Sequence, residues 1–186
     1  MKNHEEVLEY VREHAVAARL IAPQSPMPTV PLAAAALGVP EGKIVKTIVF
    51  ETKSAVGGRQ SAVEDTEDRY RRLPTADRRP GVAVAIVTGD VRVDRSRVAA
   101  VLNLPTLKLA SPETVVRVTG FEVGGVPPVA HVSAVPVVVD RGVLAHDIVY
   151  GGGGDEDHML EIAPKDIVRL TNAIVADITL EGGGES

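Results

Sequence analysis

Hydrophobic positions recur at helical spacing in the first part of the chain. Within residues 5–20 the apolar side chains include Val7, Leu8, Val11, Ala15 and Ala18, three or four residues apart. This spacing predicts an N-terminal helix, which with its flanks occupies residues 1–22. Three prolines between residues 23 and 28 then require an extended connector, because proline cannot continue a helix.

Local start and stop signals predict four more helices. Pro31–Leu37 has a proline at its first position, and Gly38 follows its last residue. Asp94 is a typical N-cap residue before a further helix, and Asn103 is suited to its C-terminus. The remaining helices follow the same reasoning, so the predicted set is Pro31–Leu37, Asp94–Leu102, a helix opened by Ser111-Pro112, and Pro164–Thr171 ended by Asn172.

Short apolar runs rich in valine and isoleucine predict the strands. These runs are Ile44–Phe50, Val82–Thr88, Leu107–Leu109, Val135–Val139, Asp147–Tyr150, Met159–Ile162 and Ile174–Ile178, with a turn at Arg141-Gly142. Strands and helices do not alternate strictly, which argues against a purely parallel sheet. The pattern predicts an α/β fold of mixed α+β type: one domain over residues 1–186, with a barrel-like mixed β-sheet, partly closed, and helices packed outside.

Three segments break the pattern. Residues 51–80 carry many charges and few large apolar side chains, so we expect a surface insertion. Gly151–Gly154 is predicted to be a glycine loop that leads into a strand. It lacks the Gly-Lys-Ser/Thr ending of a phosphate-binding loop, which argues against a nucleotide triphosphate site. Residues 180–186 are expected to be a frayed tail.

Composition removes several classes of function. The 186 residues contain no cysteine, which excludes disulfides, thiol nucleophiles and metal–thiolate sites. No apolar run approaches the roughly 18 residues of a membrane span, and the polar start is unlike a secretory signal, so we expect a soluble cytoplasmic protein. Aromatic residues make up 3% and the net charge is −5, which disfavours base stacking and a globally basic nucleic-acid binder.

Lys46 is the first residue with candidate chemistry, because it interrupts the apolar run Ile44–Phe50. A lysine there either faces a pocket or extends its amine to water. In a pocket, its charge suits anion binding and a lowered pKa would suit proton transfer. An edge-strand lysine with a solvated head is the alternative.

Two further features concern glycine loops. The loop Gly124–Pro128 lets a ligand approach the backbone closely and can aim free N–H groups at an oxyanion, although a plain turn has the same composition. His131 and His158 each neighbour a glycine loop and could position water or a carbonyl. The run Asp155–His158 matches no known metal-loop spacing, so no metal site is predicted. Ordinary capping or exposed side chains remain the alternative for both histidines.

Motifs in a fixed order give the chain a resemblance. The motifs are Thr29 with Ala33–Pro40 and Ile44–Phe50, then Ala110–Glu113, Thr119–Phe121 and Val123–Pro128, and finally Ile162–Ile167, Leu170–Ala173 and Val175–Ile178. In order and spacing they resemble the YbaK/prolyl-tRNA synthetase-associated domain family. The resemblance covers roughly residues 29–178 apart from the insertion at 51–80.

The resemblance implies a fold and an activity. It implies a barrel-like mixed sheet and hydrolysis of the ester of mischarged aminoacyl-tRNA, without metal or organic cofactor. It implies that Lys46 contacts the tRNA terminus and that Gly124 and Gly125 hold the substrate carbonyl. A terminal ribose hydroxyl would help activate the water, and small amino acids such as Ala, Ser or Cys would be preferred. The full substrate-binding set expected on this basis is Thr29, Thr47, Val126, Pro127, Pro128, His131, Gly152 and His158.

Expected partners are mischarged tRNA and an aminoacyl-tRNA synthetase, with no membrane, and the oligomeric state stays open between monomer and dimer. The stretch from residue 69 to 79 holds five arginines against one acid, and we expect these to contact the tRNA backbone: Arg69, Arg71, Arg72, Arg78 and Arg79. The sequence departs from the family where some members carry Ser in the loop matching Gly151–Gly154 and Asp near Met159. The alternative function is therefore a non-catalytic tRNA- or synthetase-binding module of the same fold.

Overall fold

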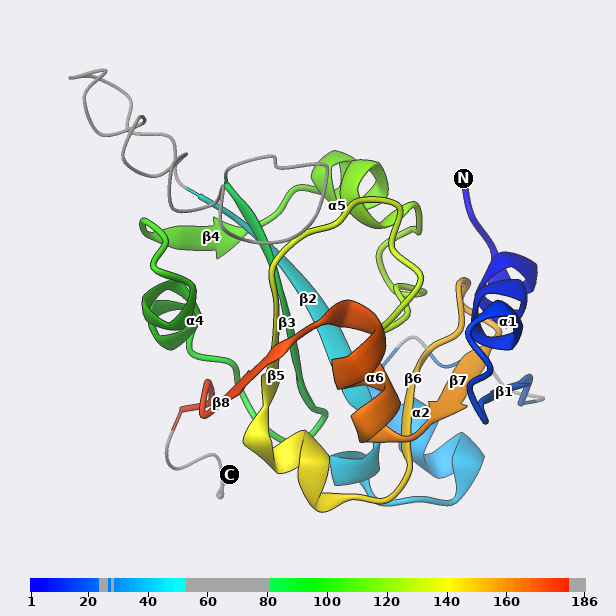
Figure 1. Ribbon diagram of the computed structural model, residues 1–186. Helices are drawn as coiled ribbons and strands as arrows, with labels where there is room; N and C mark the ends of the chain where they lie inside the picture. Colours follow the sequence, from blue (N-terminus) through cyan, green and yellow to red (C-terminus); the bar gives the residue numbers. More distant parts are fainter. Residues whose placement is uncertain (24–26, 28, 53–80, 181–186) are drawn as a thin grey trace.

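Two β-sheets form the frame of the protein in the computed structural model, which describes residues 1–23, 27, 29–52 and 81–180 (Figure 1). The larger sheet has the strand order β4-β2-β3-β5-β8. Strand β2 is antiparallel to β3 and β4, whereas β5 is parallel to β3 and β8, so the sheet is mixed. Its strands are β2 (Val45–Thr52), β3 (Val82–Thr88), β4 (Leu107–Leu109), β5 (Val137–Asp140) and β8 (Ile174–Ala176).

Strand β3 is buried along its whole length, which explains its unbroken apolar sequence. Val84 and Ile86 pack on one face, in the cluster that contains Ile167 of α6 (Pro164–Thr171). The alternate residue Val87 packs on the other face with Val98 of α4 (Arg95–Leu102). Since side chains alternate across a strand, a strand covered on both faces needs apolar residues at every position.

The smaller sheet is antiparallel and has the order β1-β7-β6. Its strands are β1 (Arg19–Ile21), β6 (Val149–Gly152) and β7 (Met159–Ile162). Helix α1 (His4–Glu13) lies beside β7 in Figure 1, and its buried Val7 and Val11 share a core cluster with Leu160. The remaining helical elements are α2 (Val30–Leu37), η1 (Glu41–Lys43), α5 (Pro112–Thr119) and η2 (Arg141–Ala145).

Most helix boundaries follow the signals in the sequence. Asp94 caps α4 by accepting hydrogen bonds from two backbone amides, and Asn103 ends it in the left-handed conformation with φ 54°. Gly38 ends α2 in the same way with φ 66°. Ser111 caps α5 through a hydrogen bond to the Thr114 amide. These predictions are confirmed because each depends on a contact between residues a few positions apart.

The N-terminal helix predicted over residues 1–22 is too long. Helix α1 ends at Glu13, and Ala15 adopts the left-handed conformation with φ 51°. Arg19–Ile21 then forms β1, which pairs with β7, and the Arg19 guanidinium donates a 2.7 Å hydrogen bond to Glu161. Strand pairing with a distant segment has therefore overridden the helical spacing of the apolar residues.

The prediction of a mixed α/β fold is confirmed, and five of its details need correction. The two sheets do not close into a barrel in the described part of the chain, although an isolated bridge joins Ile44 to Tyr150. Gly151 and Gly152 belong to strand β6 rather than to a loop, and Arg141–Ala145 is a 3₁₀ helix rather than a two-residue turn. Glu51 and Thr52 extend β2, while residues 53–80 of the predicted insertion lie outside the described residues. The Leu180 amide donates to the Arg92 carbonyl, so the predicted tail begins no earlier than residue 181.

Asp140, the last residue of β5, provides a test of what stabilises the end of this strand. Its buried carboxylate accepts 2.9 Å hydrogen bonds from the amides of Gly142 and Ile178. Asp140→Ala leaves both amides without this acceptor, and we expect the free energy of unfolding to fall by about 2–4 kcal/mol in denaturant titrations. Asp177→Ala is the control, because Asp177 pairs with Arg141 at the surface and its loss should cost less than about 1 kcal/mol. Equal losses for the two variants would contradict this role.

Candidate functional site

A cavity of about 390 Å³ lies between β2, α2 and the loop that follows α5. This volume is at the lower end of the range for ligand-binding pockets, about 300–1,000 Å³. Its walls are largely apolar, with Lys46, Thr29 and Thr47 as the polar exceptions. The lining residues are Met27, Thr29, Val30, Ala33, Ile44, Val45, Lys46, Thr47, Ile48, Val49, Leu109, Ala110, Val115, Val123, Gly124, Val126, Gly152 and Met159.

Lys46 lines this cavity from strand β2 and is half-buried. Its Nζ atom donates hydrogen bonds to the carbonyls of Gly89, at 3.1 Å, and Val91. An ammonium group has three N–H donors, so two carbonyl contacts leave one for a ligand. Burial lowers the pKa of Lys46 below its ordinary value of 10.5, while the nearby carboxylate of Asp90 acts in the opposite direction. Lys46 therefore places a partly desolvated ammonium group, fixed by two carbonyl contacts, at the wall of an apolar cavity.

Two threonine hydroxyls add polar groups to the wall. Thr47 follows Lys46 on β2, and its Oγ1 atom is buried without a hydrogen-bond partner in the described part of the chain. Thr29 occupies the N-cap position of α2, yet its side chain makes no capping hydrogen bond. Because a buried hydroxyl without a partner is costly, Thr47 is suited to bind a polar ligand. Thr29 is exposed, and it offers a second hydroxyl that the helix does not use.

The loop at residues 124–126 presents backbone to the cavity. Gly124, with φ +102°, and Val126 both line it. The Gly125 amide donates to the Glu122 carbonyl at 3.2 Å and so closes the turn. Within the described residues, no backbone hydrogen bond uses the amides of Gly124 or Val126. Of the predicted pair, the Gly125 amide is thus used within the turn, whereas the Gly124 amide, like that of Val126, makes no backbone–backbone hydrogen bond in this part of the structure.

Gly152 forms the opposite side of this contact. A Cβ atom at Gly152 would lie 2.5 Å from the Val126 carbonyl oxygen and 2.8 Å from the Gly125 carbonyl oxygen. These are backbone atoms, so any side chain at this position would push the loop out of place. Glycine at 152 is what allows the loop to lie against β6.

Several residues of the predicted site do not line the cavity. Pro128 packs against Gly151, and the His131 Nε2 atom lies 2.8 Å from the Pro127 carbonyl oxygen. Since a carbonyl only accepts, Nε2 carries the hydrogen of this bond. His158 also lies away from the cavity lining and contacts Asp155. The five arginines predicted to bind tRNA, Arg69, Arg71, Arg72, Arg78 and Arg79, lie outside the described residues.

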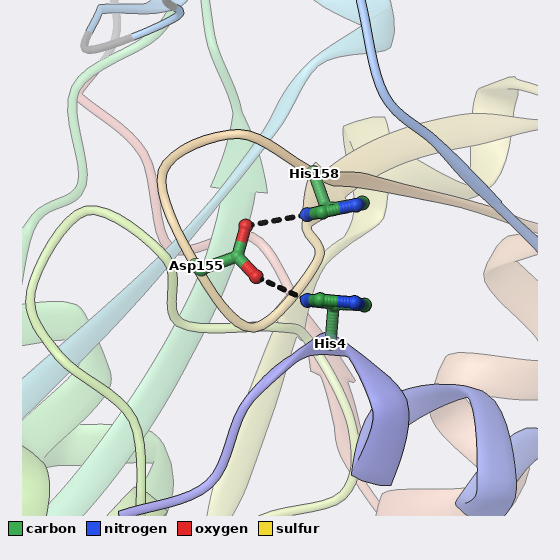
Figure 2. A group of neighbouring side chains, drawn as sticks. All are labelled: His4, Asp155 and His158. Carbon is green, nitrogen blue, oxygen red and sulfur yellow. Dashed lines mark hydrogen bonds and ion pairs between the residues drawn. The ribbon is translucent and has the colours of Figure 1, made fainter.

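A group of three side chains that the sequence analysis did not predict lies next to the loop at residues 124–126 (Figure 2). The carboxylate of Asp155 contacts the Nδ1 atom of His4 through Oδ2 and that of His158 through Oδ1, each at 2.6 Å. The two imidazole rings are stacked, with centroids 3.9 Å apart and an angle of 17° between their planes. His4 is 151 positions from Asp155, so no local spacing could reveal the group.

In the described part of the chain, these three side chains also carry the kinds of atom, imidazole nitrogen and carboxylate oxygen, that can bind a metal ion. Their ligand atoms lie within 4.8 Å of one another. Nearly parallel rings, however, direct their nitrogen lone pairs along parallel lines, and a metal ion would need them to converge. Hydrogen bonds from His158 and His4 lower the pKa of Asp155 against the opposing effect of burial. The geometry is that of one carboxylate bridging two histidines.

His131 gives a pH prediction. Burial lowers its pKa from 6.5 to about 4. The unfolded chain takes up this proton below about pH 6.5, whereas the folded protein resists protonation down to about pH 4. Stability from this residue is therefore complete above pH 6.5 and is lost as the pH falls toward 4. We expect His131→Gln, which places a donor near the Nε2 position, to flatten the pH dependence of the unfolding free energy between pH 6.5 and 4. Identical slopes in the two proteins would contradict this.

Comparisons with known proteins identify the family. Residues 24–170 match the family model described as the aminoacyl-tRNA editing domain. Proline–tRNA ligase of Pelotomaculum thermopropionicum is 27% identical over 150 residues, which are 80% of this chain but 21% of the ligase. A candidate Cys-tRNA(Pro)/Cys-tRNA(Cys) deacylase of Enterococcus faecalis, EbsC, is 23% identical over 110 residues, covering 59% of this chain and 67% of that protein.

Solved structures give the same result. The crystal structure of a candidate trans-editing enzyme for prolyl-tRNA synthetase has a TM-score of 0.75 and 26% identity, covering 95% of this chain and 96% of the other. The chain spans about a fifth of the length of the proline–tRNA ligase. None of the described helices has the length and apolar character needed to cross a membrane. The matched family model covers most of the sequence, from the connector before α2 to the end of α6, and the chain belongs to the aminoacyl-tRNA editing domain family.

Proposed function

We propose that the protein is a trans-editing deacylase that hydrolyses the ester of mischarged aminoacyl-tRNA carrying a small amino acid of the Ala, Ser or Cys class. The observation that carries this proposal is the apolar cavity of about 390 Å³. Its described wall includes one cation, Lys46, and two residues, Gly124 and Val126, whose amides make no backbone–backbone hydrogen bond. Membership of the editing family and the names of the relatives, a Cys-tRNA deacylase and a trans-editing enzyme, support it.

The reaction requires few protein groups. A water oxygen bonds to the ester carbonyl carbon, the bond from that carbon to the ribose oxygen breaks, and a proton from the water ends on the ribose oxygen. The products are a free amino acid and tRNA with its terminal hydroxyl restored. The amides of Gly124 and Val126 would stabilise the negative charge that develops on the carbonyl oxygen. Since the described residues that line the cavity include no carboxylate or histidine, we assign activation of the water to a hydroxyl of the terminal ribose.

Lys46 would hold the tRNA end. Its two carbonyl contacts at Gly89 and Val91 fix the ammonium at the cavity, where it can pair with a phosphate of the terminal nucleotides. A positioned ester gains rate because the reacting atoms are already aligned. The hydroxyls of Thr29 and Thr47 would bind polar atoms of the aminoacyl group, which gives each of the cavity's polar side chains a partner in the complex.

Selection by size would come from a wall that cannot easily move. Met159 and Ala33 line the cavity and belong to one buried cluster. On the other side, the loop is fixed by its backbone contact with Gly152. A closely packed apolar pocket discriminates by about 1–3 kcal/mol for each methylene. Small amino acids are therefore favoured over larger ones that share the same ester.

The main test is hydrolysis of a panel of mischarged tRNAs carrying Ala, Ser, Cys or Thr, assayed by release of the free amino acid. Lys46→Ala should lower kcat/KM for the edited species by about 100-fold, because both positioning and charge are lost. Lys165→Ala, an exposed lysine on α6 with the same change in charge, is the control and should stay within about 2-fold.

The same panel decides between the enzyme and its alternative. Hydrolysis that depends on Lys46 supports the deacylase. Binding of tRNA without hydrolysis of any species would contradict it and identify the non-catalytic tRNA- or synthetase-binding module instead.

A second prediction concerns the size of the pocket. Met159→Ala enlarges the cavity, so a larger amino acid should be excluded less strongly. We expect the ratio of kcat/KM for a larger amino acid to that for Ala to rise by about 10-fold, the lower end of the discrimination that a close-fitting pocket gives for each methylene. Ala33→Val narrows the same cavity and should shift the ratio in the opposite direction. Parallel shifts in both variants would show that these residues do not determine size selection.

A further inference from the structure

The loop that presents Gly124 and Val126 to the cavity rests on another loop behind it. A Cβ atom at Gly125 would lie 2.7 Å from the Cα atom of Asp155, so the two backbones are in direct contact. The Gly154 amide also donates a 2.9 Å hydrogen bond to the Gly125 carbonyl. The position of the Gly124–Val126 backbone therefore depends on the position of residues 154 and 155.

Asp155 is itself held from two sides. His158, at the end of the same loop, contacts Oδ1, which also accepts a 3.0 Å hydrogen bond from the Asp157 amide. His4 contacts Oδ2 and belongs to α1, at the other end of the sequence. Figure 2 shows the carboxylate beside the two stacked rings, with both Nδ1 atoms turned toward it.

Helix α1, which carries His4, is itself held in place by packing and capping. Val7 and Val11 are buried in the main core, and Asn3 and Glu6 form a capping box at its start. A Cβ atom at Gly154 would lie 2.7 Å from the backbone of residues 3 and 4, so the helix start and the loop are also in backbone contact. A continuous series of packed contacts thus runs from α1 through Asp155 to the cavity wall.

We propose that His4, Asp155 and His158 are positioning residues for the deacylation reaction, and that they hold the Gly124–Val126 amides where the carbonyl oxygen of the ester binds. This inference rests on the proposed function. None of the three side chains lines the cavity, so they act through the loop rather than on the substrate. Helix α1, which precedes the matched family segment at residues 24–170, becomes part of the site.

The test compares His4→Ala with His4→Asn in the full chain. The Asn side chain places an N–H donor close to the Nδ1 position, so it can keep the contact with Asp155 that Ala loses. His14→Ala is the control, because His14 lies at the end of the same helix and contacts Tyr10 instead of the loop. Asp155→Ala removes both histidine contacts at once.

Steady-state kinetics on the edited tRNA should separate positioning from binding. We expect His4→Ala and Asp155→Ala to lower kcat by about 10-fold or more while KM stays within about 2-fold, since a small misplacement of the reacting groups is costly in rate. His4→Asn should recover kcat to within about 2-fold of the unmodified protein, and His14→Ala should leave it unchanged. An unchanged kcat in a folded Asp155→Ala protein would overturn the proposal, as would a loss in His4→Asn equal to that in His4→Ala.

Hydrogen exchange measures the loop without reference to activity. The amides of Gly125 and Gly154, which donate to Glu122 and Gly125, should exchange faster in His4→Ala than in the unmodified protein. The Gly120 amide, which donates to Val116 in α5, is the internal reference. Unchanged exchange at Gly125 and Gly154 would overturn the positioning role. If the unmodified protein hydrolyses no charged tRNA, the proposed function fails, and exchange alone decides whether the cluster holds the loop.

Discussion

Close approach between two stretches of backbone is the constraint on which the site depends. Strand β6 and the loop at residues 124–126 lie so near each other that a single added carbon at Gly152 would meet the Val126 carbonyl oxygen at 2.5 Å. Glycine is the residue that permits such contact, because it has no Cβ atom. The contact shapes one wall of the cavity and joins the smaller sheet to the segment after α5.

The larger sheet supplies the other wall. Because β3 is covered by helices on both faces, its neighbour β2 is held firmly along most of its length. Lys46 projects from this rigid strand, and its amine is tied to the loop that immediately follows β3. A charged group on a long flexible side chain thereby obtains a defined position. The cavity combines a rigid strand, a rigid loop and a short helix, α2, whose N-cap residue, Thr29, makes no capping hydrogen bond with its hydroxyl.

Much of this could be predicted from the sequence, and the failures share a physical cause. The β3 run and the caps at Asp94 and Gly38 are local signals, and each predicted its feature correctly. Arg19–Ile21 was misread because its conformation is decided by pairing with β7, about 140 positions away.

The cluster of His4, Asp155 and His158 was not predicted for the same reason, a contact between residues far apart in the sequence. His4 meets Asp155 only in the folded chain, and its own sequence neighbourhood shows an ordinary acidic helix start. The sequence analysis expects His131 and His158 to meet the substrate. In the structure their hydrogen-bond partners are a loop carbonyl and a carboxylate, and neither side chain lines the cavity. Proximity in sequence to a glycine loop does not specify which side of that loop a side chain occupies.

The backbone contact at Gly152 has a consequence for how such a site can change during evolution. A larger residue at 152 is unfavourable while the loop stays where it is, because its Cβ atom would meet the backbone of Gly125 and Val126. The two segments are therefore expected to be epistatic: a substitution at either place is tolerated only in the presence of a compensating one at the other. New specificities would then arise by paired exchanges across the β6–loop contact, so that variants altered at one of these positions alone form a barrier between related activities.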